Sequence, residues 1–313
     1  MRYPEIDPYD SGMLDVGDGH RVYWETCGNP DGKPVLVLHG GPGSGCSDGM
    51  RQFFDPERYR IVLVDQRGCG RSTPHAGDTV DALSANTAAH LMADLELLRG
   101  FLGISRWMLF GGSWGCVLGL AYAERYPERV SEIVMMGLAT DRQVEIDQLT
   151  GGLGGMFPEA FARFRDGVPE GERGGDLAGA YYRLLVDPDP AVHEAAARGW
   201  CAWEEAMLPG VPPSPRFGDD RFRLGFARLV THYFSRGCFL EDGGILRDAG
   251  RLTGIPVVLV QGVLDLGNLV GTPWLLERAI PGAELVLVGG AGHTTAVSSM
   301  EDALVAATDR FAG

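Results

Sequence analysis

The chain has 313 residues, 45% of them hydrophobic, a formal net charge of −15 and a mean hydropathy of −0.03. This length allows one large domain with an insertion, or two domains, and the composition is typical of a soluble globular protein with a sizeable core. The negative charge argues against a nucleic-acid partner. No stretch approaches the ~18–20 apolar residues that span a bilayer, and the N-terminus lacks the apolar segment of a signal peptide. We therefore expect a cytoplasmic protein without a membrane partner.

The six cysteines are scattered along the chain without a Cys-x-x-Cys pair. This arrangement provides neither zinc-ligand spacing nor the framework of a disulfide-stabilised domain, so we expect reduced thiols. No metal and no cofactor is predicted, and the sequence carries no signal of oligomeric state.

Short apolar runs without alternation recur along the chain, and such runs are typical of strands buried on both faces of a parallel sheet. The predicted strands cover residues 34–38, 59–64, 107–110, 132–136, 256–260 and 284–288. Residues 86–102 and 116–126 have amphipathic helical patterns, with Asn86 as a candidate N-cap and Pro127 as a stop signal. The alternation of strands and helices predicts an α/β fold with a mostly parallel central sheet flanked by helices.

The middle of the chain departs from this alternation. Residues 140–250 contain Gly- and Pro-rich turns and helical patterns at 177–186 and 191–207, without a strong strand. We interpret this segment as a helical cap inserted into the sheet domain. The predicted organisation is a first part of the core at 1–139, the cap at 140–250 and the last part of the core at 251–313.

A serine between glycines follows the third predicted strand. Gly111-x-Ser113-x-Gly115 lies between a strand pattern and a helix pattern, which is the context of the nucleophile elbow of α/β-hydrolases. In such an elbow the serine stands clear of the sheet in a strained conformation, and side chains on the flanking residues would clash with the strand or the helix. The alternative is a glycine-rich turn with an incidental serine.

A nucleophile elbow requires an acid after a late strand and a histidine after the last one. His293 follows the final predicted strand among small residues, and as a general base it would take the proton of Ser113. Asp265 follows the preceding strand and gives the chain order Ser–Asp–His. Asp141, which follows an earlier strand, is the rival acid, and the chain order favours Asp265.

An acyl-transfer site also needs hydrogen-bond donors for the oxyanion of its tetrahedral intermediate. The glycine-rich segment 39–43 follows the first predicted strand, where this fold supplies one backbone N–H, and the residue after the nucleophile, Trp114, supplies the other. Phosphate binding by these glycines is excluded because the Gly-Lys-Ser/Thr ending of a Walker motif is absent.

Three motifs together resemble the proline iminopeptidase family, α/β-hydrolases that remove an N-terminal proline. The motifs are His-Gly-Gly-Pro-Gly at 39–43, Asp-Gln-Arg-Gly-Cys-Gly-Arg-Ser at 65–72 and Gly-Gly-Ser-Trp-Gly at 111–115. The resemblance covers nearly the whole chain and implies a triad of Ser113, Asp265 and His293. It also implies an oxyanion hole formed by Gly41 and Trp114, and a cap that holds the free amino end of the substrate.

The chain departs from the family pattern where the substrate would bind. Family members typically hold the substrate amine with two cap glutamates. The first aligns with Glu204, which shares a helix face with Trp200, and the second falls on Val230. A family phenylalanine that lines the proline pocket falls on Ala139. We therefore expect Glu204 to bind the amine in a more apolar site with weakened selectivity for proline; a solvated helix charge is the alternative for Glu204.

These features predict a serine hydrolase that removes an aminoacyl residue through an acyl-enzyme on Ser113. The expected substrate is a small molecule or short peptide with a free amino terminus. Members of the family that remove aminoacyl protecting groups from polyketide intermediates in macrolactam antibiotic biosynthesis resemble this chain, and an apolar cap would suit such substrates. The alternatives are an ordinary proline iminopeptidase, an esterase or acyltransferase on the same scaffold, and a non-catalytic binding protein.

Overall fold

The computed structural model describes residues 1–313, and its centre is one eight-stranded sheet with the order β1-β2-β4-β3-β5-β6-β7-β8. The strands are β1 (Pro8–Gly17), β2 (His20–Gly28), β3 (Lys33–Leu38), β4 (Tyr59–Asp65), β5 (Trp107–Gly112), β6 (Val130–Met136), β7 (Val257–Gly262) and β8 (Glu284–Val288). The pairs β1/β2 and β2/β4 are antiparallel and all other neighbours are parallel. The predicted α/β fold class is confirmed, and all six predicted strands are present.

The N-terminal hairpin of β1 and β2 has no counterpart among the predicted strands. β1 lies at the edge of the sheet and its residues are exposed or half-buried. Such a strand has no continuous apolar run, because only part of its surface faces the core. The turn at Asp18 and Gly19, both with positive φ, joins the two strands.

Ten α-helices accompany the sheet. They are α1 (Ala88–Phe101), α2 (Trp114–Arg125), α3 (Gln143–Thr150), α4 (Pro158–Asp166), α5 (Leu177–Leu185), α6 (Pro190–Ala206), α7 (Asp220–Phe234), α8 (Gly244–Asp248), α9 (Thr272–Ala279) and α10 (Ser298–Phe311). The prediction of Asn86 as the N-cap of α1 is wrong. Thr87 caps this helix by accepting a hydrogen bond from His90 N, while Asn86 is buried and its side chain accepts a hydrogen bond from Tyr233.

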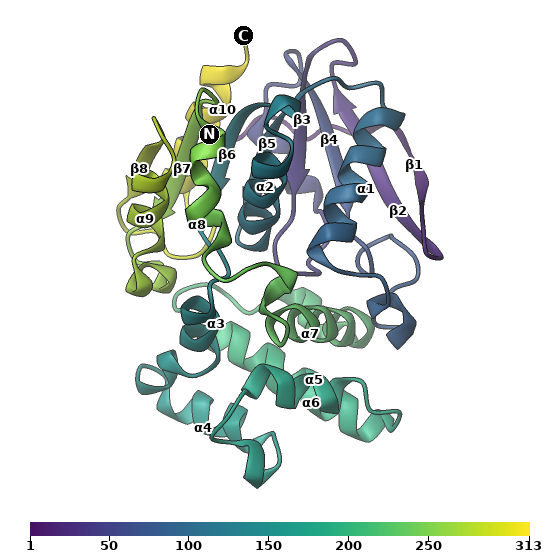
Figure 1. Ribbon diagram of the computed structural model, residues 1–313, viewed down its shortest axis with the longest axis vertical. Helices are drawn as coiled ribbons and strands as arrows, with labels where there is room; N and C mark the ends of the chain where they lie inside the picture. Colours follow the sequence, from purple (N-terminus) through teal and green to yellow (C-terminus); the bar gives the residue numbers. More distant parts are fainter.

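Helices α1, α2 and α8 cover one face of the sheet, and α10 lies on the other (Figure 1). Helices α3 to α7 form a separate layer beyond the ends at which the parallel strands finish, which is the place of the predicted cap (Figure 1). The segment 140–250 also includes α8, which packs against α2 and α9 and thus belongs to the layer on the sheet. None of the helices combines the length and the apolar character needed to cross a bilayer.

Apolar residues of the buried strands alternate between the two faces of the sheet. Leu36 and Leu109 belong to one hydrophobic cluster, whereas Val37 and Phe110 belong to another on the opposite face. The first cluster continues into the cap, where it includes Trp200 and aromatic neighbours of that residue. The cap is therefore packed onto the sheet domain by a shared core, and the cavity between the two is bounded by well-packed elements.

Candidate active site

Ser113 occupies the sharp turn between β5 and α2, with φ of 57° and ψ of −122°. A non-glycine residue adopts this conformation at a cost, and such strain is common at functional sites. A Cβ on Gly111 would lie 2.6 Å from the carbonyl oxygen of Gly115, and one on Gly115 would lie 2.2 Å from that of Leu38. Both glycines are thus required by close backbone contacts that hold the strained serine in place.

The loop after β6 contacts both the serine and the histidine. The N–H of Ser113 donates to the carbonyl oxygens of Met136 and Gly137, at 3.1 Å each. A Cβ on Gly137 would lie only 2.9 Å from Cε1 of His293, so the imidazole ring rests against this glycine. The backbone of Gly137 therefore brings His293 to the neighbourhood of Ser113.

His293 is paired with Asp265 and not with the rival acid Asp141. Nδ1 of His293 lies 2.7 Å from Oδ2 of Asp265, whose other oxygen accepts the N–H of Gly267 at 2.8 Å. Burial raises the pKa of Asp265, but the charge and hydrogen bond of His293 outweigh it, so the pKa is lowered. The charge of Asp265 in turn raises the pKa of His293. The pair leaves Nε2 of the imidazole available to a nucleophile.

The two residues predicted to form the oxyanion hole, Gly41 and Trp114, line one cavity together with Ser113. Trp114 is the first residue of α2, and the N–H groups of a first helical turn have no acceptor within the helix. Its indole Nε1 donates to Oε1 of Gln66 at 2.8 Å, which fixes the side chain. A Cβ on Gly41 would lie 2.5 Å from the N atom of Gly43, so the tight loop requires glycine there.

The cavity has a volume of about 580 Å³ and lies between the sheet domain and the cap. Its lining includes the Ser113, Asp265 and His293 side chains together with Ala139 and Glu204. The loop after α6, residues 207–211, also lines it and was not identified as part of the site from the sequence. This loop has no chemical signature in the sequence, and its role follows only from the way α6 packs.

Glu204 is the carboxylate of α6 that faces the cavity. Its Oε1 accepts a hydrogen bond from Nε1 of Trp200 at 3.0 Å. Burial raises the pKa of Glu204 to about 7, and the Trp200 hydrogen bond and the charge of His293 oppose that rise. Trp200 was expected to bind substrate, but it is buried, does not line the cavity, and instead orients Glu204.

Val230 was also expected at the substrate and does not reach it. Its side chain has no exposed surface and packs in the core shared by cap and sheet. Phe234, one helical turn further along α7, lines the cavity instead. Val230 and Phe234 lie on the same face of α7, and only the last residue of this helix, Phe234, reaches the cavity.

A second cavity of about 480 Å³ shares Ser113 and His293 with the first. Its lining includes Met50, Met136 and Met300, so it is partly apolar. No group of three or more His, Cys, Asp or Glu side chains is placed to hold a metal ion, and all six cysteines are free thiols.

Comparisons with known proteins identify the family of this chain. Residues 33–298 match the model of the alpha/beta hydrolase fold family. A probable proline iminopeptidase of Streptomyces coelicolor is 56% identical, covering 99% of this chain and 97% of its own, and a proline iminopeptidase of Xylella fastidiosa is 46% identical, covering 99% and 98%. The crystal structure of a Mycobacterium smegmatis proline iminopeptidase has a TM-score of 0.64 and 21% identity, with 97% of each chain covered, and so supports the fold. The chain therefore belongs to the proline iminopeptidase family of α/β-hydrolases.

Proposed function

We propose that this chain removes the N-terminal residue from substrates with a free amino group, through an acyl-enzyme on Ser113. The observation that supports this most directly is the position of Glu204. Its carboxylate lines the same cavity as Ser113 and His293, accepts a hydrogen bond from Trp200 and forms no ion pair with an arginine or lysine. A carboxylate in that setting binds an ammonium group through charge-assisted hydrogen bonds. The names of the most similar relatives point to the same activity.

In the first half of the reaction, Oγ of Ser113 attacks the carbonyl carbon of the aminoacyl amide while His293 takes the hydroxyl proton. The carbonyl oxygen becomes an oxyanion, to which the N–H groups of Gly41 and Trp114 donate. The C–N bond then breaks, His293 gives its proton to the departing amine, and the aminoacyl group remains as an ester on Ser113.

In the second half, water attacks the ester and gives one proton to His293. The new tetrahedral intermediate collapses, the bond to Oγ breaks, and His293 returns the proton to Ser113. The free amino acid leaves. Asp265 holds the imidazole in the tautomer that accepts at Nε2, and stabilises the imidazolium in both halves.

The surroundings of Ser113 favour relaxed selectivity for proline and a bulky leaving group. Ala139 lines the cavity with a single methyl group, which cannot form the wall of a slot closed around a pyrrolidine ring. The second cavity, which also reaches Ser113, offers apolar space for the leaving amine. The substrate class we propose is therefore an aminoacyl amide whose amine can belong to a peptide or to a longer acyl chain, such as an aminoacylated polyketide in macrolactam biosynthesis.

Glu204→Gln tests the amine site, because glutamine keeps the acceptor for Trp200 and removes only the charge. For alanyl-β-naphthylamide we expect kcat/KM to fall by roughly 30- to 1000-fold, the equivalent of about 2–4 kcal/mol for a lost buried ion pair. Hydrolysis of p-nitrophenyl butyrate, which has no amine, should change by less than about threefold. Glu194→Gln, at an exposed site on the same helix, is the matched control.

Three outcomes would contradict the proposal. An equal loss for the amide and the ester would show that Glu204 does not recognise the amine. Efficient cleavage of an N-acetylated alanyl substrate would remove the requirement for a free amine. A marked preference of the natural chain for prolyl- over alanyl-β-naphthylamide would contradict the relaxed selectivity derived from Ala139.

A further inference from the structure

The cavity is lined by two carboxylates that the proposed reaction does not use, Asp141 and Glu145. Asp141 follows β6 on the loop that leads to α3, with φ of 49°, and it lines the same cavity as Ser113 and Glu204. No N–H or O–H group donates to its Oδ2, which has almost no accessible surface, and the side chain has the Cys238 thiol, a weak donor, as its partner. A buried carboxylate oxygen without a strong donor is costly, and native structures rarely contain one without a reason.

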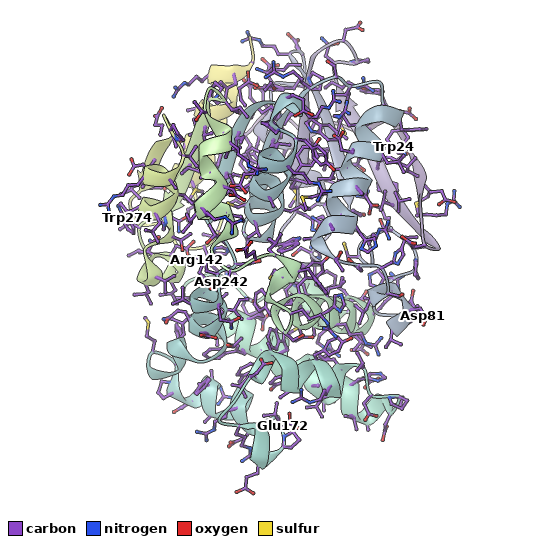
Figure 2. The ribbon with its side chains drawn as sticks, viewed as in Figure 1. Trp24, Asp81, Arg142, Glu172, Asp242 and Trp274 are labelled. Atoms are coloured by element: carbon purple, nitrogen blue, oxygen red, sulfur yellow. The ribbon has the colours of Figure 1, made fainter.

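The cation beside Asp141 is already engaged elsewhere. Nε of Arg142 donates to Oε1 of Glu145 at 3.0 Å, and its Nη2 donates to Thr272. Figure 2 labels Arg142 near Asp242, where the cap joins the sheet domain. Glu145 also accepts hydrogen bonds from Thr140, so it has both a cation and hydrogen-bond donors as partners. Asp141 is the carboxylate of this group that is left without a positive partner.

The surroundings of Asp141 also disfavour its charged form. Burial raises its pKa to about 7, while a hydrogen bond from the thiol of Cys238 lowers it and the charge of Glu145 raises it further. A cation delivered by a ligand would relieve both the desolvation and the repulsion.

Asp141 and Glu204 line the cavity from different elements, Asp141 from the loop between β6 and α3 and Glu204 from α6. In an aminoacyl substrate, the α-carbon next to the attacked carbonyl carries both the amino group and the side chain. With the amino group at Glu204, the side chain is the part free to extend toward Asp141, past the small Ala139.

We infer that Asp141 ends the pocket for the side chain of the N-terminal residue and selects side chains that carry a cationic amine, such as lysine or ornithine. This inference rests on the proposed function, because it requires the amino group to be held at Glu204. The apolar residues Leu266 and Val270, which line the same cavity, would contact the methylene groups of such a side chain.

The test compares lysyl- with norleucyl-β-naphthylamide, which differ only in the side-chain ammonium. We expect the natural chain to prefer the lysyl substrate by at least about tenfold in kcat/KM, and Asp141→Asn to reduce the lysyl-to-norleucyl ratio by roughly 10- to 100-fold. The ratio cancels any general loss of activity in the variant. Asp147→Asn, an exposed aspartate on α3, is the matched control and should keep the ratio.

A second measurement needs no variant. Pentane-1,5-diamine should inhibit the natural chain at least about tenfold more strongly than pentylamine, because only the diamine can place one ammonium group near Glu204 and the other near Asp141. A norleucyl preference of the natural chain, an unchanged ratio in a folded Asp141→Asn, or equal inhibition by the two amines would overturn the inference. If neither substrate is cleaved, or if N-acetylation does not slow cleavage, the proposed function itself fails. Cleavage that depends on the free amine but not on Asp141 overturns this inference alone.

Discussion

The sheet domain and the cap hold their functional groups in different ways. In the sheet domain, Ser113 is positioned by the close backbone contacts of Gly111 and Gly115, where any side chain would clash, and His293 rests against Gly137. In the cap, Glu204 extends from a helix and is oriented by one hydrogen bond from Trp200. The reacting atoms therefore depend on the backbone of the fold, whereas the amine recognition that we propose depends on one side chain and its hydrogen bond.

The largest expected effect comes from removing the nucleophile. Ser113→Ala should reduce kcat for every substrate, amide or ester, on the order of 10⁵-fold, because the remaining groups cannot form the acyl-enzyme. Its thermal unfolding should match that of the natural chain or lie slightly above it, since alanine removes only a hydroxyl. Active-site labelling with a fluorophosphonate and mass spectrometry should find the probe on Ser113 and nowhere else. Labelling of another residue would contradict the assignment.

A second prediction concerns the backbone that supports the serine. In Gly115→Ala the new Cβ would lie 2.2 Å from the carbonyl oxygen of Leu38, which cannot move without breaking β3. We expect the free energy of unfolding to fall by about 2–4 kcal/mol, measured by urea denaturation. Gly250→Ala is the control, because a Cβ there meets nothing within 4 Å. Similar stabilities for the two variants would show that the elbow is not packed as described.

The smallest expected difference between the natural chain and a variant lies in how steeply kcat/KM depends on pH. His293 must be neutral to accept a proton and Glu204 must be ionised to bind the amine, and the pKa of each is raised, that of Glu204 to about 7. Activity on alanyl-β-naphthylamide should therefore fall with two protonations as pH decreases below about 7, approaching a hundredfold per pH unit.

Removing one of the two groups should simplify this profile. In Glu204→Gln, or with an ester that lacks an amine, only His293 remains and the limiting slope should be tenfold per pH unit. Asp265 and Asp141 line the same cavity, but the pKa of Asp265 is lowered and the alanyl side chain carries no charge for Asp141 to bind. Because the charges of Glu204 and His293 influence each other, the two protonation steps are properties of the pair and neither is assigned to one residue alone. An identical slope in the variant would contradict an ionised Glu204 in binding.

Much of the sheet domain could be predicted from the sequence because its signals are local. Buried parallel strands produce continuous apolar runs, and the Gly111-x-Ser113-x-Gly115 pattern reflects contacts within one turn. The edge strand β1 lacked such a run and was missed. The His293–Asp265 pairing followed from the chain order that the fold imposes, and the structure places the two side chains 2.7 Å apart.

The lining of the cap could not be predicted in the same way. Which turns of a helix reach a cavity is decided by how helices pack on one another, and no local pattern in the sequence records it. Val230 and Trp200 therefore lie buried although their positions in the sequence pointed to the substrate, while Phe234 and the loop at 207–211 line the cavity. Asp141 was considered only as a rival catalytic acid, because its lack of a positively charged partner becomes visible only in three dimensions.

The loop after β6 has a consequence for the design of variants. Within five residues it supports the serine and His293 through Gly137 and lines the cavity through Ala139 and Asp141. A mutant library that varies 139 and 141 while keeping Gly137 would therefore sample new side-chain pockets on an unchanged set of reacting groups. Insertions or deletions anywhere in this loop would instead shift pocket and nucleophile together, so point substitution is the route by which such an enzyme can acquire a new substrate.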